Sequence, residues 1–383
     1  MRSLFPTPRV AVSILFLLNG FIVGNWAPKL PFLFERLGIS EATLGGLILF
    51  FGLGGLIVFP TCGVLLSKFG SRSTTLTFAL IICFAFPALT YSSNLYAIGF
   101  VMFLMGINLI GMDICMNANV VVSEQKTKLS FMSSCHGFWS VGGIVGALSG
   151  GAILDNFGIY THAYFVTIFC ITCFAIAWPI LQTDTQSVEQ KAEKLQFPKN
   201  PTLYILGLIT FLAIVPEGAV IDWSALYYIS ELDASATMAG YAFAALSTTM
   251  AIIRFSGDVL CTKFGNINVM RASAIISAVG MVFAGQATSI LFATIGFALA
   301  GIGIANLVPI VFSVAGRQKD VKMGISIATV GFTASVGLMG APAALGYAAE
   351  YMSFSTIYTL SAICFVIIYF LSPVVGNADE SGK

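Results

Sequence analysis

Charge is the scarcest property of this sequence. Only 9% of its 383 residues are Asp, Glu, Lys or Arg, whereas 57% are hydrophobic. Soluble domains carry about 25% charged residues, so the composition excludes a water-soluble fold over this length. The formal net charge of +1 gives no electrostatic basis for binding nucleic acid. The composition therefore predicts an all-α protein that crosses a membrane many times.

The sequence also has little that could hold a metal or a cofactor. His136 and His162 are its two histidines, and its eight cysteines are scattered through apolar runs, where cysteine behaves as a small hydrophobic residue. It contains no glycine-rich phosphate loop that ends in Lys-Ser or Lys-Thr. We therefore expect no metal, no cofactor, no enzymatic activity and no drive by ATP.

Long apolar runs divide the chain into segments that can span a bilayer. One span needs about 20 mostly apolar residues, and the sequence offers twelve such segments: 10–34, 42–66, 74–92, 96–122, 130–153, 161–181, 202–230, 237–260, 269–289, 291–314, 323–349 and 353–373. The ninth and tenth are the least clearly separated, by a short turn at 286–289. The polar stretch 182–200 predicts a cytoplasmic linker between two six-helix bundles, 1–181 and 201–375, with a cytoplasmic tail at 376–383.

Basic residues fall on one side of this arrangement. With the N-terminus in the cytoplasm, fifteen of the eighteen Lys and Arg residues are cytoplasmic, and the exceptions are Lys29, Arg36 and Arg254. An excess of Lys and Arg marks cytoplasmic loops. We therefore expect a monomeric, multipass protein of a cell membrane with both termini in the cytoplasm, and the compact loops suggest a bacterial inner membrane.

The two halves of the chain repeat one another at an offset near 195 residues. Val-Leu-Leu-Ser-Lys-Phe-Gly at 64–70 recurs as Val-Leu-Cys-Thr-Lys-Phe-Gly at 259–265. Ala-Thr-Leu-Gly-Gly at 42–46 recurs as Ala-Thr-Met-Ala-Gly at 236–240, and Asn25-Trp26 recurs as Asp222-Trp223. Six spans in each half place both halves in the same orientation, which is the parallel repeat found in one class of secondary transporters.

The first of these repeated loops resembles a family signature. Residues 63–72 are similar to the loop between the second and third spans of the major facilitator superfamily, Gly-x-x-x-Asp-Arg/Lys-x-Gly-Arg/Lys-Arg/Lys, although Ser67 and Ser71 replace an acidic and a basic position. The resemblance covers essentially the whole chain. It implies a twelve-helix fold of two pseudo-symmetric bundles, in which spans 1, 4, 7 and 10 line a central cavity. It also implies gate or loop-anchoring roles for Lys68, Arg72, Arg254, Asp258 and Lys263, with Arg254 and Asp258 paired on one helix face.

Two further stretches resemble one branch of that superfamily. Asp113-x-x-x-Asn117 is similar to the Glu-x-x-x-Asn of the fucose permease branch, and residues 217–223 look like a stretch of the related YbjJ-like group of small bacterial facilitators. That branch uses a first-span aspartate in proton coupling. This chain has only Asn19 and Asn25 in its first span, so that part of the mechanism does not carry over.

Two carboxylates within apolar segments are the main candidates for chemistry. Glu217 follows Pro216 near the middle of the seventh span, and Asp113 lies within about 6 Å of the middle of the fourth. A charge at the bilayer centre costs about 2.5–3.5 kcal/mol, so such groups are expected in the protein interior or in a water-lined cavity. We predict that Glu217 or Asp113 binds the coupling proton. The alternative is that each carboxylate has only a structural role.

Polar and aromatic side chains of the same four spans are the candidate solute ligands: Asn19, Asn25, Trp26, Asn117, Asp222, Trp223, Tyr227 and Asn306. Asp222 is alternatively expected to pair with Lys29, near the outer end of the first span, as a gate between the halves. The aromatic residues equally fit a role in packing or interfacial anchoring.

These features together predict a secondary active transporter. We expect it to move a small polar solute, such as a sugar or a related metabolite, by alternating access and proton symport. Proton-driven efflux of drugs or metabolites is the alternative, and a receptor or membrane enzyme is a remote one. The expected partners are the solute, protons and the lipid bilayer.

Overall fold

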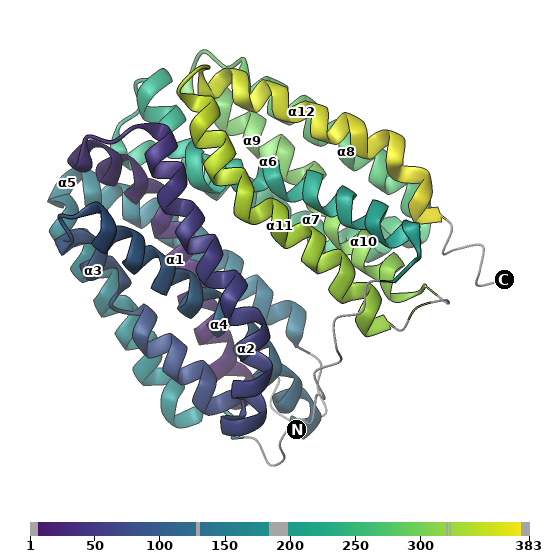
Figure 1. Ribbon diagram of the computed structural model, residues 1–383, viewed down its shortest axis with the longest axis horizontal. Coiled ribbons are helices and arrows are strands. Elements are labelled where there is room, and N and C mark those ends of the chain that lie inside the picture. The colour runs from purple at the N-terminus through teal and green to yellow at the C-terminus, as the bar shows by residue number, and fades with distance from the viewer. Residues whose placement is uncertain (1–6, 128–130, 184–197, 319–320, 322, 377–383) are drawn as a thin grey trace. The chain divides into compact units, whose positions relative to one another are not determined.

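The computed structural model describes residues 7–127, 131–183, 198–318, 321 and 323–376. Over these residues the chain forms α-helices and two short 3-10 helices, and this described part contains no β-strand (Figure 1). The all-α fold predicted from the composition is therefore confirmed.

The described residues of the first half form the helical segments α1 (Thr7–Leu37), α2 (Glu41–Ile82), α3 (Ala85–Tyr91), α4 (Leu95–Thr127) and α5 (Met132–Ile180). Two of them contain a sharp turn at a glycine with positive φ, Gly70 in α2 and Gly158 in α5. Glycine reaches this conformation at no steric cost. The predicted second span and the first half of the third therefore lie in α2, the rest of the third includes α3, and the fifth and sixth share α5.

The second half begins with α6 (Pro201–Glu231), the short η1 (Ala236–Met238), α7 (Tyr241–Phe264) and α8 (Asn266–Gly285). It continues with α9 (Ile290–Ile304), α10 (Leu307–Gly316), α11 (Met323–Ala349), α12 (Phe354–Leu371) and η2 (Ser372–Gly376). The predicted turn between the ninth and tenth spans falls where α8 ends and α9 begins. The tenth span is itself broken between α9 and α10, at Ala305 and Asn306.

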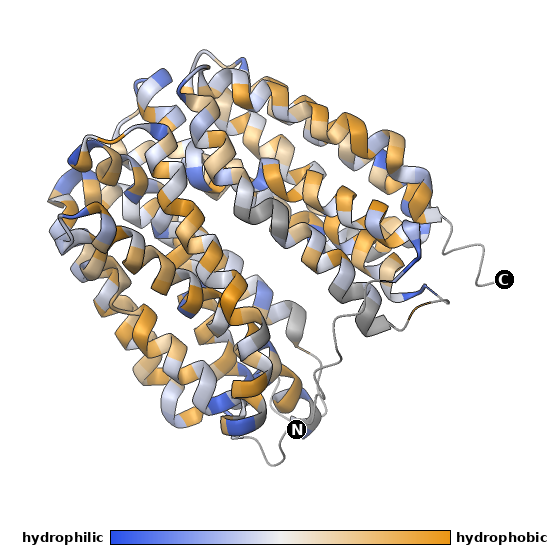
Figure 2. Ribbon diagram, viewed as in Figure 1, coloured by the Kyte–Doolittle hydropathy of each residue, from blue (hydrophilic) through white to orange (hydrophobic). Residues whose placement is uncertain are grey.

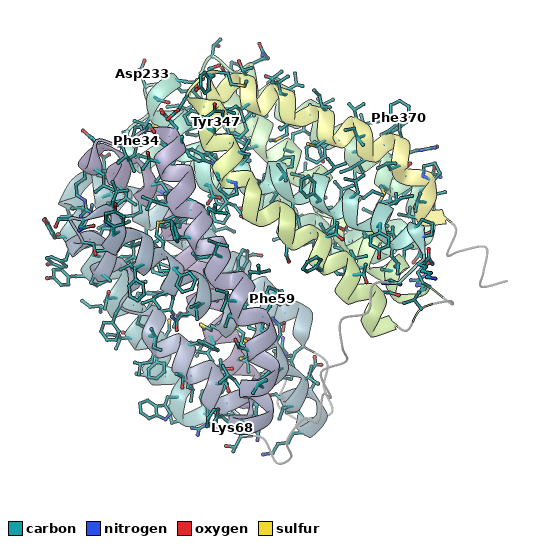
Figure 3. The ribbon with its side chains drawn as sticks, in the orientation of Figure 1. Phe34, Phe59, Lys68, Asp233, Tyr347 and Phe370 are labelled. Carbon is teal, nitrogen blue, oxygen red and sulfur yellow. The ribbon has the colours of Figure 1, made fainter. Side chains whose placement is uncertain are left out.

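The helices have the length and surface of membrane-spanning segments. Eleven stretches within the described residues are long and apolar enough to cross a membrane, and one of these, Ser134–Ile180, has 47 residues. A single crossing needs about 20 residues, so this stretch, which turns at Gly158, accounts for two crossings and the total agrees with twelve. Hydrophobic residues, orange in Figure 2, are spread along most of the helices. Large side chains such as Phe59 and Phe370 are 53% and 73% exposed (Figure 3), as expected of surfaces that face lipid.

The chain divides into two compact units. Unit 1 comprises residues 1–39, 46–192 and 235–240, and unit 2 comprises 40–45, 193–234 and 241–383. Each unit thus includes one short segment from the opposite half of the sequence, and these segments, 40–45 and 235–240, are separated by the repeat offset of 195 residues. Most of the predicted linker at 182–200 and of the tail at 376–383 lies outside the described residues.

Small residues allow α1 and α5 to approach very closely in unit 1. A Cβ atom at Gly20 would collide with the carbonyl oxygen of Trp139, and one at Gly24 would collide with that of Gly143. From the α5 side, a Cβ at Gly142 would collide with the Leu17 carbonyl. Glycine at these contacts permits backbone-to-backbone packing of membrane helices, and it positions the polar side chains of both helices.

Candidate functional site

Asn19 links three helices of unit 1. Its amide nitrogen donates a hydrogen bond of 3.1 Å to the Leu109 carbonyl on α4, and its amide oxygen accepts one of 2.9 Å from the indole nitrogen of Trp139 on α5. Only 3% of Asn19 is exposed. Because a buried polar group without a partner costs about 1–3 kcal/mol, both bonds hold this side chain in one orientation.

Asp113 and Asn117 lie one turn apart on α4, farther along the same helix as Leu109. The Asn117 amide nitrogen donates to the Asp113 carbonyl at 2.8 Å, which leaves its side-chain oxygen to accept from His136 Nε2, 3.2 Å away on α5. The imidazole also meets the edge of the Phe16 ring, with 4.9 Å between the ring centroids. Asp113 is half-buried, and His136 is exposed. Unit 1 therefore joins the Asn117 amide to the His136 imidazole, and the Asp113 side chain lies one helical turn from that amide on α4.

Glu217 is half-buried on α6 in unit 2, directly after Pro216. The charged group whose field acts on it is the guanidinium of Arg254, on α7. The Nε atom of Arg254 also donates to the Ala305 carbonyl at 3.4 Å, at the break between α9 and α10. Asn306, which follows in the break, is 4% exposed and does not cap α10 with its side chain. Arg254 is thus bonded to the interruption of the tenth span, at a distance from which its charge still acts on the carboxylate of the seventh.

The predicted aromatic ligands of unit 2 lie in an aromatic core. The Tyr227 hydroxyl donates to the Ala284 carbonyl at 2.8 Å, and the ring is tilted against Tyr358 with 5.2 Å between centroids. Trp223 stacks on Phe354 at 5.8 Å, and its buried indole nitrogen has no hydrogen-bond partner within the described structure. The hydroxyl of Tyr227 is therefore committed to helix packing, whereas the Trp223 indole keeps an open donor.

Asn25 and Lys29 are fully buried within unit 1. Asn25 interacts with His162 on α5, and Lys29 donates to Thr90 on α3. Trp26, between them on α1, is 9% exposed. Asp222 is half-buried on α6 and belongs to unit 2, so its predicted pairing with Lys29 stays a prediction.

Comparison with known proteins agrees with this architecture. The family model of the Major Facilitator Superfamily matches residues 12–318. The chain belongs to the major facilitator superfamily. Membership in this family of transporters means that the protein acts in membrane transport.

Relatives of this superfamily member are found in several bacteria. The chain is 28% identical to an uncharacterized MFS-type transporter of Yersinia pestis, over 94% of each chain. It is 30% identical to an uncharacterized transporter of Sinorhizobium fredii, over 98% of this chain and 100% of the relative. It is also 29% identical to the membrane protein MosC of Rhizobium meliloti, over 89% of this chain and 83% of that protein.

Solved major facilitator structures show the same fold. The nucleoside transporter NupG superimposes with a TM-score of 0.74 at 14% identity, covering 95% of this chain and 98% of NupG. A bacterial homologue of the human lysosomal transporter Spinster superimposes with a TM-score of 0.69 at 15% identity, covering 97% and 96% of the two chains.

The basic residues of the superfamily's signature loops occupy related positions in the two halves. Lys68 lies over the Phe69 ring, and Lys263 lies over the Phe264 ring, each 5.2 Å from the ring centroid. Arg72 donates to the carbonyls of Leu181 and Trp178 at the end of α5, at 3.0 and 2.8 Å. The side chain of Asp258 lies outside the described structure, so its pairing with Arg254 remains a prediction.

Several residues of these networks carry little signal in the sequence. Trp139, Thr90 and the Leu109 carbonyl are identified only by their partners on other helices. His162 does have a signal, because an ionisable residue within an apolar span indicates a functional or paired group.

Proposed function

We propose that this transporter moves a small polar solute, such as a sugar or a related metabolite, by alternating access coupled to proton symport. The observation that carries the proposal is that each half contributes a half-buried carboxylate from the interior of a membrane-spanning helix, Asp113 from α4 and Glu217 from α6. A buried carboxylate can exchange its charge for a proton, which is the event that links a proton gradient to solute movement.

The surroundings of Asp113 favour a hydroxyl-rich solute. Asn117 lies one turn beyond Asp113 on α4 and interacts with His136, while Asn19 and Trp139 are joined to α4 one turn before Asp113, through the Leu109 carbonyl. Sugars present alternating hydroxyl donors and acceptors together with apolar ring faces, and polar groups of these kinds next to an aromatic ring fit both.

The surroundings of Glu217 favour the coupling role. Arg254 acts on Glu217 and also binds the carbonyl at the α9–α10 break. Protonation of Glu217 would remove the negative charge that attracts Arg254, which would alter the hold of this side chain on the break. A proton on one residue would thereby change the packing of three helices.

The proposal also includes the branch of the superfamily, the cellular membrane and the orientation of the chain. We place it near the fucose permease-related branch, on the basis of Asp113-x-x-x-Asn117, and in a bacterial inner membrane as a monomer with cytoplasmic termini. The distribution of Lys and Arg supports the orientation.

A ligand screen followed by flux measurement tests the proposal. The melting temperature of the purified protein is measured with sugars, sugar derivatives and nucleosides. The compound that raises it most is then used in flux measurements on proteoliposomes that contain the protein. Symport predicts that an inward proton gradient drives accumulation of that compound. Loss of a preloaded compound under the same gradient would instead establish proton-driven efflux, and flux independent of the gradient would refute proton coupling.

A further inference from the structure

The interior of unit 1 holds two ionisable groups that the proposed solute site does not use. Lys29 on α1 and His162 on α5 both have 0% exposure. The ammonium of Lys29 donates a hydrogen bond of 2.7 Å to the Thr90 hydroxyl on α3. Ionisable side chains that are fully buried in membrane-spanning helices are costly and are found where they are paired or functional.

The hydrogen bonds of Asn25 fix the tautomer of His162. The Asn25 amide nitrogen donates to the Phe21 carbonyl at 2.9 Å, so its amide oxygen is the atom that faces His162 Nε2, also at 2.9 Å. An amide oxygen can only accept, which places the imidazole proton on Nε2. The Nδ1 atom of the neutral ring is then a hydrogen-bond acceptor.

This acceptor has no partner, although a donor with spare capacity lies nearby. His162 Nδ1 is buried and unpaired within the described structure. An ammonium has three donors, and Lys29 uses one of them for Thr90. Asn25 and Phe86 both contact the His162 ring, and Lys29 and its partner Thr90 lie one helical turn beyond them on α1 and α3, so the ammonium lies close to the imidazole.

Among the described residues, the neighbouring side chains offer no further group that could take up the proton from Lys29 or His162. Arg36, also on α1, is the further charge that acts on Lys29, and it is bound to the carbonyls of Leu89, Thr90 and Ser92. From α3, the Phe86 ring meets the imidazole edge-on, at 5.5 Å between centroids. No carboxylate of the described residues is among the charges that act on Lys29 or His162.

We propose that Lys29 and His162 form an internal proton site, in which one proton is shared between Lys29 Nζ and His162 Nδ1 through one bridging water. In the transfer, an N–H bond at Nζ breaks and an N–H bond at Nδ1 forms, while Nε2–H continues to donate to Asn25. The positive charge moves from α1 to α5, and the net charge of the pair is unchanged. The Nδ1 lone pair disfavours an anion here, and the ammonium disfavours a metal cation.

The site lies at the contact between α1 and α5, so movement of the proton can affect how these helices pack. Asn25 lies against α5 so closely that a Cβ atom at Gly150 would be 2.6 Å from its side-chain oxygen, and one at Gly146 would be 2.8 Å from its side-chain nitrogen. A charge that moves from α1 to α5 therefore acts where these helices are in contact. This role in transport rests on the proposed proton coupling, whereas the shared proton itself does not.

Nitrogen NMR can observe the shared proton without any solute. Because His136 and His162 are the two histidines, protein with isotope-labelled nitrogen only in histidine, purified through a histidine-free tag and placed in lipid vesicles, gives signals from two imidazoles. His136→Gln assigns them. We expect His162 to be the Nε2–H tautomer with a hydrogen-bonded Nδ1, whose nitrogen signal shifts in one step toward that of a free acceptor as rising pH removes the Lys29 proton, because a neutral amine is a weaker donor than an ammonium.

Two variants distinguish a shared proton from a Lys29 and a His162 that are buried side by side but do not interact. Lys29→Met should move the Nδ1 signal of His162 to the value of a free acceptor and abolish the step. Thr90→Val removes the competing acceptor and keeps both ionisable groups, so it should strengthen the Nδ1 hydrogen bond. A His162 signal that is the same in the wild type and in both variants, or an Nδ1–H tautomer, would overturn the proposal. Since no transport is measured, that result would leave the solute and coupling proposal untouched.

Discussion

The indole of Trp139 donates a hydrogen bond of 2.9 Å to the side-chain oxygen of Asn19. The same asparagine donates to the Leu109 carbonyl, so α1, α4 and α5 meet at one polar side chain. The bond orients the elements that carry Asp113 and His136.

Replacement of Trp139 by Phe tests this junction, because it keeps an aromatic ring and removes the donor. Hydrogen bonds between membrane helices contribute about 0.6 kcal/mol on average, and an acceptor left without a partner raises the cost toward about 1–3 kcal/mol. We expect a lower melting temperature in detergent. Trp178→Phe is the control, because that side chain is 54% exposed and its change should leave the melting temperature within error.

The contact between α1 and α5 predicts a strong effect of one methyl group. Gly20→Ala would place a Cβ against the Trp139 carbonyl, so the helices would have to separate. We expect overpacking to cost about 1–3 kcal/mol or more, with reduced yield of folded protein on size-exclusion chromatography. Gly63→Ala, in the exposed part of α2 with nothing near its Cβ position, should be neutral or slightly stabilising. Equal effects of the two substitutions would contradict the close approach.

The commitment of the Tyr227 hydroxyl to the Ala284 carbonyl predicts a stability effect. Tyr227→Phe should destabilise the protein by about 0.5–1.5 kcal/mol and leave the KM for transport almost unchanged. Thermal unfolding and uptake kinetics on the same preparation check both parts. A large rise in KM with unchanged stability would show that the hydroxyl binds the solute instead.

The one-sided distribution of Lys and Arg predicts that the C-terminus is cytoplasmic. A C-terminal fusion to a reporter that fluoresces only in the cytoplasm should be bright, and a fusion to a phosphatase that is active only outside it should be inactive. The opposite pair of results would reverse the orientation of every loop.

The spans were predictable because each is a run of apolar residues long enough to cross a bilayer. At Gly70 in α2 and Gly158 in α5 the backbone leaves helical φ and ψ, so two helices meet at each glycine, between the predicted second and third spans and between the fifth and sixth. The third span is interrupted before α3, at Cys83 and Phe84, because Pro87 cannot donate a backbone hydrogen bond to the Cys83 carbonyl.

The candidate carboxylates could be predicted, but their partners could not. Asp113 and Glu217 are detectable because charge is rare in apolar spans. Sequence spacing relates Arg254 only to neighbours on its own helix, such as Asp258, whereas its field acts on Glu217 from another helix. Similarly, Asn25 was identified as a candidate ligand, but its bond to His162 joins residues 137 positions apart, and only tertiary packing brings them together.

The central claim is that Asp113 or Glu217 couples solute movement to protons. Proteoliposomes containing the solute identified by thermal stabilisation are measured for gradient-driven accumulation and for exchange of labelled against unlabelled solute. We predict that Glu217→Gln or Asp113→Asn abolishes accumulation and retains exchange. The controls Glu35→Gln and Asp233→Asn, at exposed carboxylates, should behave as the wild type. Full accumulation in both Glu217→Gln and Asp113→Asn would contradict the account.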